Sequence, residues 1–409
     1  MYADDLKAAL DRKLSVQSPR LLGDYIAASG PIHCVDAWSY LGRAIAAELK
    51  GDEHASLHLA YYAELRAAMS LMAAQGVGVF LSRHYVLDDA GHAHQLGHLS
   101  KGKKPRLSTH QAMWFILEHW AGLQRSASLV GELISVNGVT ADEWLRNSKS
   151  GTSLRPIAQE WFRAWGVDLR AMSLDRDARN VVSYRPTQMR DRPGFTLSDS
   201  VDFLEAFWRL LEPQPGAPFA GLDQHLVRGV MEYAHYSGGV PTPSRRDELR
   251  RRTTEAGETA GLSTAAAESI AGFVARDVDP GEHYVLERAT DAATEGPLKN
   301  RGPMCRAVLL GRMATGAWTS VLLRAGISWT DLSFWWDDFG HRRGYWESGT
   351  APDLMADLWP QVAEALDDAG IVVASFGGSV EAWNAARPLA AAFTVLDGVE
   401  RVSLWGLSA

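Results

Sequence analysis

Apolar residues recur every three or four positions along most of the chain, which is the spacing of one buried helix face. Clean runs of alternating apolar and polar residues are scarce. The spacing predicts helices over 36–50, 54–74, 108–120, 155–166, 174–185, 196–212, 226–236, 262–276, 304–325 and 353–369. Periodicity fails between 77 and 107, which favours a loop or hairpin, and only 371–376 has the composition of a strand.

Local signals mark several of the predicted helix ends. Asp36 is a candidate N-cap, and Ser108 followed by Gln111 fits a capping box. Glycines at 76, 326 and 370 are predicted stops. The fold class is therefore predominantly α, and we expect two helical halves. The expected division is a first helical domain over 1–212, a Pro- and Gly-rich linker with a short helix over 213–243, and a second helical domain over 244–409.

Composition supports a folded chain and narrows the class of partner. Of the 409 residues, 46% are hydrophobic and 22% are charged, well away from the composition of disordered chains. The net charge of −8 argues against non-specific coating of DNA. Two distant cysteines, a charged start (MYADDLKAALDRK) and the absence of a long uncharged stretch lead us to expect a cytoplasmic location and no membrane contact.

Several enzyme signatures are missing from the sequence. It contains no GxxxxGK[ST] loop, no GxGxxG after a strand, no HExxH, no GxSxG and no paired CxxC. Nucleotide-driven motors, Rossmann dehydrogenases, zincins and α/β-hydrolases are poor fits. We expect no cofactor and no resident metal.

The segment DRDARNVVSYRP, residues 175–186, holds the first candidate site. Arg179 and Asn180 are followed by Tyr184, near the point where Pro186 must end or kink a helix. An Arg, a polar residue and, after four intervening positions, a His or Tyr resembles the R-x4-6-H motif of HEPN-type RNases. Upstream, His58, with the tyrosines at 61 and 62, resembles the helix that packs against the motif helix in HEPN-like and YaaC-like bacterial proteins. The resemblance covers residues 30–210.

The resemblance implies a specific chemistry. In that family two protomers face each other, the Arg holds the scissile phosphate, and the His assists attack by the ribose 2′-hydroxyl without a metal. It implies that Arg179 grips phosphate, Asn180 orients it and Tyr184 takes the acid/base position in a homodimer. Tyr184 departs from the family pattern. A phenol with a pKa near 10 needs a neighbouring cation, Arg179 or Arg185, to act as a base at neutral pH.

Histidines and basic residues gather between 84 and 119. His92, His94 and His98, with Asp88 or Asp89, have a spacing that a metal could use, and a polar loop is the competing interpretation. Next to them lies a basic run that could attract RNA or another anion, or serve as a solubilising loop. This candidate anion-binding set is Lys101, Lys103, Lys104 and Arg106, together with Arg185.

Tryptophan is unusually frequent, with 15 residues. Six of them fall on helical stripes beside aliphatic residues and are predicted to fill the core against small neighbours: Trp38, Trp114, Trp120, Trp161, Trp165 and Trp208. The stretch from Trp329 to Trp346 instead interleaves rings with charges, which suits base stacking or a protein partner and equally suits a wedge between helices. Its candidate partner-binding residues are Trp335, Trp336, Arg342, Arg343 and Trp346.

Two functions follow as expectations. The first is a metal-independent ribonuclease that acts on RNA as the effector of a bacterial toxin or antiviral defence system. The alternative is a non-catalytic helical adaptor or sensor that binds a protein or nucleic-acid partner in a defence complex.

Overall fold

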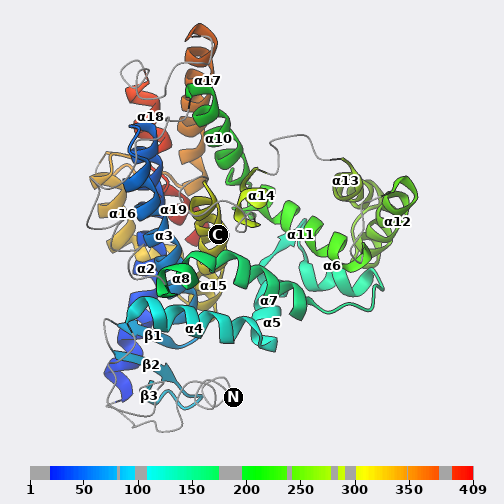
Figure 1. The fold of residues 1–409 in the computed structure, drawn as a ribbon, viewed down its shortest axis with the longest axis horizontal. Coiled ribbons are helices and arrows are strands. Elements are labelled where there is room, and N and C mark those ends of the chain that lie inside the picture. Colours follow the sequence, from blue (N-terminus) through cyan, green and yellow to red (C-terminus); the bar gives the residue numbers. More distant parts are fainter. Residues whose placement is uncertain are drawn as a thin grey trace. The chain divides into compact units, whose positions relative to one another are not determined.

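Helices dominate the structure, as the apolar spacing predicts. The computed structural model describes residues 19–80, 83–96, 108–174, 196–236, 242–277, 284–290, 301–347, 349–376 and 389–408. Its strands are short and antiparallel, so the predominantly α class is confirmed (Figure 1). The chain forms two compact units: unit 1 comprises 1–119, 164–205 and 285–409, and unit 2 comprises 120–163 and 206–284. The segment 213–243, expected as a linker, lies within unit 2.

Three long helices build the centre of unit 1. The helices α2 (Pro19–Leu49) and α3 (Glu53–Ala74) pack along each other, and α15 (Gly302–Arg324) packs against both (Figure 1). Among the described residues, the other helical elements that lie wholly or mostly outside unit 2 are α4 (Thr109–Ala121), α8 (Val167–Leu174), α10 (Leu197–Leu210), α14 (Tyr284–Thr290), η2 (Trp329–Leu332), α16 (Ser333–Arg342), η3 (Met355–Leu358), α17 (Trp359–Phe376), α18 (Ala390–Leu396) and α19 (Arg401–Leu407).

Indole rings and glycines interlock α2 with α15. Trp38 of α2 lies over Gly311 of α15, where an added Cβ would sit 3.0 Å from the ring. Reciprocally, an added Cβ at Gly30 of α2 would lie 1.8 Å from the ring of Trp318 in α15. The Trp38 indole N–H donates to Thr315 at 3.0 Å, so each buried ring has both space and a polar partner. Five of the six tryptophans predicted to lie in the core are buried: Trp38, Trp114, Trp120, Trp165 and Trp208. Trp161 is only partly buried.

A three-stranded antiparallel sheet follows α3. The strands β1 (Val77–Phe80), β2 (Arg83–Leu87) and β3 (Ala93–Leu96) pair in that order, which confirms a hairpin for the described part of 77–107. Gly76 adopts a φ of 78° directly before β1, a left-handed conformation that glycine tolerates and that ends the helix as predicted.

Unit 2 is built from shorter elements. It contains α5 (Gln124–Leu133), the paired strands β4 (Ser135–Val136) and β5 (Val139–Thr140), α6 (Ala141–Asn147), most of α7 (Leu154–Trp165), α11 (Ala220–His235), α12 (Pro243–Thr259) and α13 (Thr264–Ala275). The pair α12 and α13 pack along each other, and both contact α11. A complete capping box between Thr140 and Glu143 starts α6.

Three local predictions are wrong: the strand over 371–376, the helix stop at 370 and the N-cap at Asp36. Residues 371–376 continue α17 through the glycine at 370, although the buried residues of that helix end at Ala369 and Ile371 is exposed. Asp36 is not an N-cap, since α2 begins at Pro19 and runs through Pro31. No helix within the described residues has both the length and the apolarity to cross a membrane.

Candidate functional site

The residues of the RNase-like motif cannot be placed. Arg179, Asn180, Tyr184 and Arg185 fall in 175–195, outside the described residues, and the basic run at 101, 103, 104 and 106 falls in the undescribed stretch 97–107. The structure does place the upstream helix. The residues at 58, 61 and 62 all belong to α3.

A cluster of aromatic rings from α2, α3 and α4 centres on Tyr62. The Tyr62 ring stacks on Tyr40 of α2 at a centroid distance of 5.5 Å. It meets the His58 imidazole edge-on at 4.8 Å and the Tyr61 ring at 5.7 Å. His110 of α4 lies 6.4 Å away. Tyr62 therefore contacts rings from three helices while remaining half-buried.

Local structure fixes the position of His110. It lies in the first turn of α4, where Ser108 and Gln111 form the predicted capping box: the Gln111 N–H donates to the Ser108 hydroxyl at 3.4 Å, and the Ser108 N–H donates to Gln111 Oε1 at 3.2 Å. The Nδ1 atom of His110 makes a short hydrogen bond with the buried Tyr61 hydroxyl, and the two rings stack. This bond orients the imidazole and occupies its Nδ1 atom, so Nε2 is the atom through which His110 would transfer a proton.

The same face continues along α2 and α3 with charged groups. Arg66 follows Tyr62 by four residues, so the two side chains share one side of α3. The Arg66 Nη1 contacts His33 Nδ1 at 2.9 Å, and its Nε lies 3.8 Å from Asp36 Oδ2. Burial and the Arg66 charge lower the pKa of His33 to about 4, so His33 is neutral at physiological pH. Its Nδ1 atom therefore accepts a hydrogen bond from the Arg66 guanidinium.

We call this surface the α2–α3 face; it comprises His33, Asp36, Tyr40, His58, Tyr61, Tyr62, Arg66 and His110. It combines flat rings that can stack on bases, a guanidinium suited to phosphate, and imidazoles suited to proton transfer. Burial lowers the pKa of His58, which keeps that imidazole neutral and able to accept a proton.

A buried ionic network lies beneath this face. Arg306 of α15 donates from Nε to Asp168 Oδ2 at 3.2 Å and makes a shorter contact with the same oxygen through Nη2. Its Nε also lies 3.7 Å from Glu64 Oε2 of α3, and Glu64 accepts the Leu169 N–H at 3.4 Å. Burial and the nearby Asp168 raise the pKa of Glu64 well above its usual value. The network ties α8, which ends at Leu174 directly before the Arg179 segment, to α3.

The histidines of the hairpin gather on one carboxylate. His94 Nε2 lies 2.7 Å from Asp88 Oδ2, and His92 Nδ1 lies 3.4 Å from the same oxygen. The His94 hydrogen bond holds the pKa of Asp88 below its usual range. His98 lies outside the described residues, and among the residues that are described no group of three or more His, Cys, Asp or Glu side chains could hold a metal ion.

The tryptophan-rich segment forms η2 and α16. Trp329 stacks on Trp336 at 5.4 Å with nearly parallel rings, and the Trp336 indole donates to the Trp329 carbonyl at 3.0 Å. Trp346 is buried, and its N–H donates to Asp337 at 3.3 Å. Trp335 packs partly buried against a core cluster of unit 1. Most of these rings therefore hold the segment together and attach it to unit 1.

The arginines of this segment are engaged by carboxylates. Arg342 pairs with Asp338 at 2.8 Å on the exposed side of α16, and Arg343 pairs with Glu400 at 3.1 Å. Phe334, in contrast, is 80% exposed in the first turn of α16. The outward apolar group is thus a phenylalanine that the sequence pattern did not single out.

Sequence reasoning identified only part of the α2–α3 face. The spacing of His58, Tyr62 and Arg66 at i, i+4 and i+8 is visible in the sequence, but Arg66 is not among the residues that carry the family resemblance. His33, Asp36 and Tyr40 join the face only because α2 pairs with α3 in one register. Comparison with family models, with curated proteins and with solved structures finds no match for this chain.

Proposed function

We propose that this protein is a metal-independent ribonuclease and that the α2–α3 face forms part of its RNA site. The observation that supports the proposal is the ring cluster on Tyr62, where two imidazoles and a guanidinium share one half-buried face with stacking surfaces. The network of Glu64, Asp168 and Arg306 holds α8 against α3, and the Arg179 segment follows α8 directly in the sequence.

The proposed reaction is transesterification. The ribose 2′-oxygen attacks the adjacent phosphorus, its proton passes to an imidazole such as His58, and the 5′-oxygen leaves with a proton from an acid. The products are a 2′,3′-cyclic phosphate and a 5′-hydroxyl end. By the HEPN resemblance, Arg179 grips the phosphate, Asn180 orients it and Tyr184 occupies the acid/base position. As in that family, the enzyme would act as a homodimer and serve a bacterial toxin or defence system.

The test uses the full chain with a labelled RNA in EDTA. Cleavage that leaves cyclic phosphate ends is expected for the wild type, and Arg179→Ala and His58→Ala are expected to lower its rate by about 10²-fold or more. His92→Ala is the matched control, because that half-exposed imidazole lies on the hairpin. Undiminished cleavage by Arg179→Ala, or equal losses in the two histidine variants, contradicts the proposal.

The second candidate is a non-catalytic adaptor that binds a protein partner through α16. The 80% exposure of Phe334, beside an anchored tryptophan stack, favours it. Under this alternative the wild type leaves RNA intact and copurifies with a defined partner, and Phe334→Asp releases that partner. The control is Leu354→Asp, which changes another exposed apolar residue of unit 1.

A further inference from the structure

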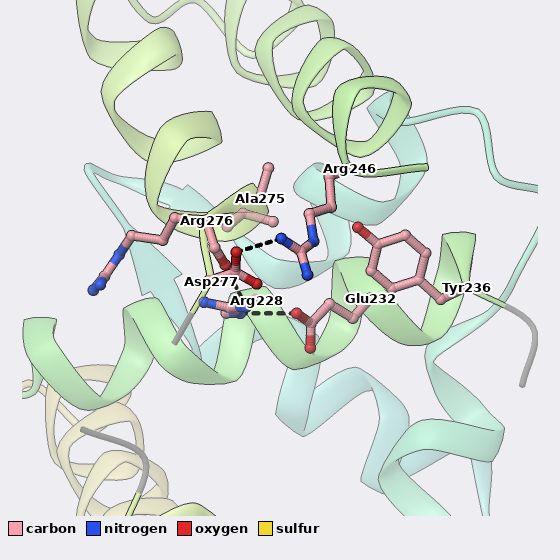
Figure 2. Close-up of a pocket in the computed structure, with 8 residues that line it drawn as sticks. Arg228, Glu232, Tyr236, Arg246, Ala275, Arg276 and Asp277 are labelled. Atoms are coloured by element: carbon pink, nitrogen blue, oxygen red, sulfur yellow. Dashed lines mark hydrogen bonds and ion pairs between the residues drawn. The ribbon is translucent and has the colours of Figure 1, made fainter. Parts of the chain in front are cut away.

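A recessed pocket of about 200 Å³ lies in unit 2, among α11, α12 and the end of α13 (Figure 2). Its polar lining consists of Arg228 and Glu232 of α11, Tyr236 directly after that helix, Arg246 of α12, and the residues at 276 and 277 that follow α13. None of these residues belongs to the α2–α3 face, so the pocket is independent of the proposed ribonuclease site.

Arg228 is the fixed cation of the pocket. It is only 6% exposed, and its Nε donates to Glu232 at 2.8 Å. Its Nη2 donates to the Arg276 carbonyl at 2.9 Å and its Nη1 to the Phe273 carbonyl at 3.4 Å. A guanidinium has five N–H donors, so these three bonds leave two without an acceptor among the described residues. A buried guanidinium with spare donors favours an anionic ligand.

Arg246 is the adjustable cation. Its Nη1 lies 2.5 Å from Asp277 Oδ2, and Figure 2 shows the two side chains meeting above Arg228. The Asp277 side chain is 78% exposed, and an ion pair with so exposed a partner contributes about 0–1 kcal/mol. The Asp277 carboxylate therefore marks a position that another oxyanion can take at little cost.

Tyr236 adds a neutral donor. Its hydroxyl points toward Arg246 in Figure 2. Burial, and then the neighbouring Glu232 carboxylate, raise the pKa of Tyr236, so the phenol keeps its proton and can donate to an anion. The Arg276 side chain points away from the pocket, with its guanidinium over the Phe273 ring at 4.8 Å, and it contributes only its carbonyl.

We propose that this pocket binds the phosphate group of a small phosphorylated ligand. The phosphate oxygens displace Asp277 from Arg246, accept the remaining donors of Arg228 and accept the Tyr236 hydroxyl. Arginine forks match the geometry of phosphate, and the volume suits a phosphate with a small substituent. The recess between helices favours a small ligand over a polynucleotide backbone.

The experiment titrates inorganic phosphate into the full chain at low ionic strength, followed by calorimetry. Arg246→Ala is expected to weaken phosphate binding by about tenfold or more, as loss of a charged hydrogen bond does. Arg245→Ala is the matched control, because it removes the same charge from the neighbouring exposed position of α12, outside the pocket lining. It should change affinity by less than about twofold.

Asp277→Asn gives the sharper result. It removes the competing carboxylate and should tighten phosphate binding, by up to about fivefold. Absence of millimolar phosphate binding by the wild type, equal losses in Arg245→Ala and Arg246→Ala, or weaker binding in Asp277→Asn would each overturn the proposal. Displacement of phosphate by a short RNA without terminal phosphates would overturn the small-ligand assignment. RNA cleavage is measured separately, so this result does not depend on the proposed ribonuclease.

Discussion

Replacing Arg306 by methionine removes the guanidinium that pairs with the buried Asp168 carboxylate and also contacts Glu64. Arg306 and Glu64 have side chains 3% and 0% exposed, and that of Asp168 is 10% exposed. Methionine keeps much of the volume, so the change is mainly electrostatic. Removing one partner of a buried ion pair leaves an uncompensated charge and costs about 3–5 kcal/mol. For a chain of this size, that corresponds to a fall in melting temperature of about 5 °C.

The assay is thermal and urea unfolding of the full chain, with hydrogen exchange to assign the loss to α3, α8 and α15. Arg342→Met is the control, because Arg342 pairs with Asp338 on the surface with side chains 75% and 58% exposed. Its loss should cost no more than about 1 kcal/mol.

A third variant tests the cause. Converting Asp168 to asparagine in the Arg306→Met background removes the orphaned charge and should recover part of the lost stability. If Arg306→Met unfolds like Arg342→Met, or if the amide variant recovers nothing, charge compensation is not what the network provides.

Three further predictions concern unit 1. Because His33 has a folded-state pKa of about 4, below its ordinary 6.5, stability present above pH 6.5 is lost as pH falls toward 4; His33→Gln should reduce that loss by about 1–3 kcal/mol in acid unfolding curves. Thr315→Val removes the acceptor of the buried α2 indole and should cost about 1–3 kcal/mol in urea unfolding. At Gly42 an added Cβ would lie 2.1 Å from the Asp397 carbonyl oxygen, so Gly42→Ala should cost about 1–3 kcal/mol and speed hydrogen exchange in α18, whereas Gly370→Ala, with open space, should not.

Helix signals that depend on neighbouring residues were predictable from the sequence. The pairing of Ser108 with Gln111 marked the start of α4, and the glycines at 76 and 326 marked the ends of α3 and α15; both adopt positive φ values there. Residues 371–376 misled because β-branched side chains favour strands only when nothing else decides. These residues lie beyond the last buried residue of α17, Ala369, and continue that helix.

Contacts between distant segments were not predictable. Asp168 and Arg306 lie 138 positions apart, and nothing in either local sequence indicates that they meet. The α2–α3 face has the same origin: His58 and Tyr62 reveal one side of α3, but Tyr40 and His33 lie opposite them only through the register of two helices. Sequence periodicity predicts which face of a helix is buried, but it does not predict which other helix packs against that face.

The reciprocal insertion of Trp38 over Gly311 and of Trp318 over Gly30 has a mechanical consequence. Each helix receives one indole ring from the other, and the two contacts lie at different levels along the pair. A slide of α15 along α2 by one turn would therefore drive both indoles into side chains. Shear between packed helices is a common way for a protein to change shape, and here it is blocked at both levels. The central helices α2 and α15 of unit 1 therefore resist shear against each other.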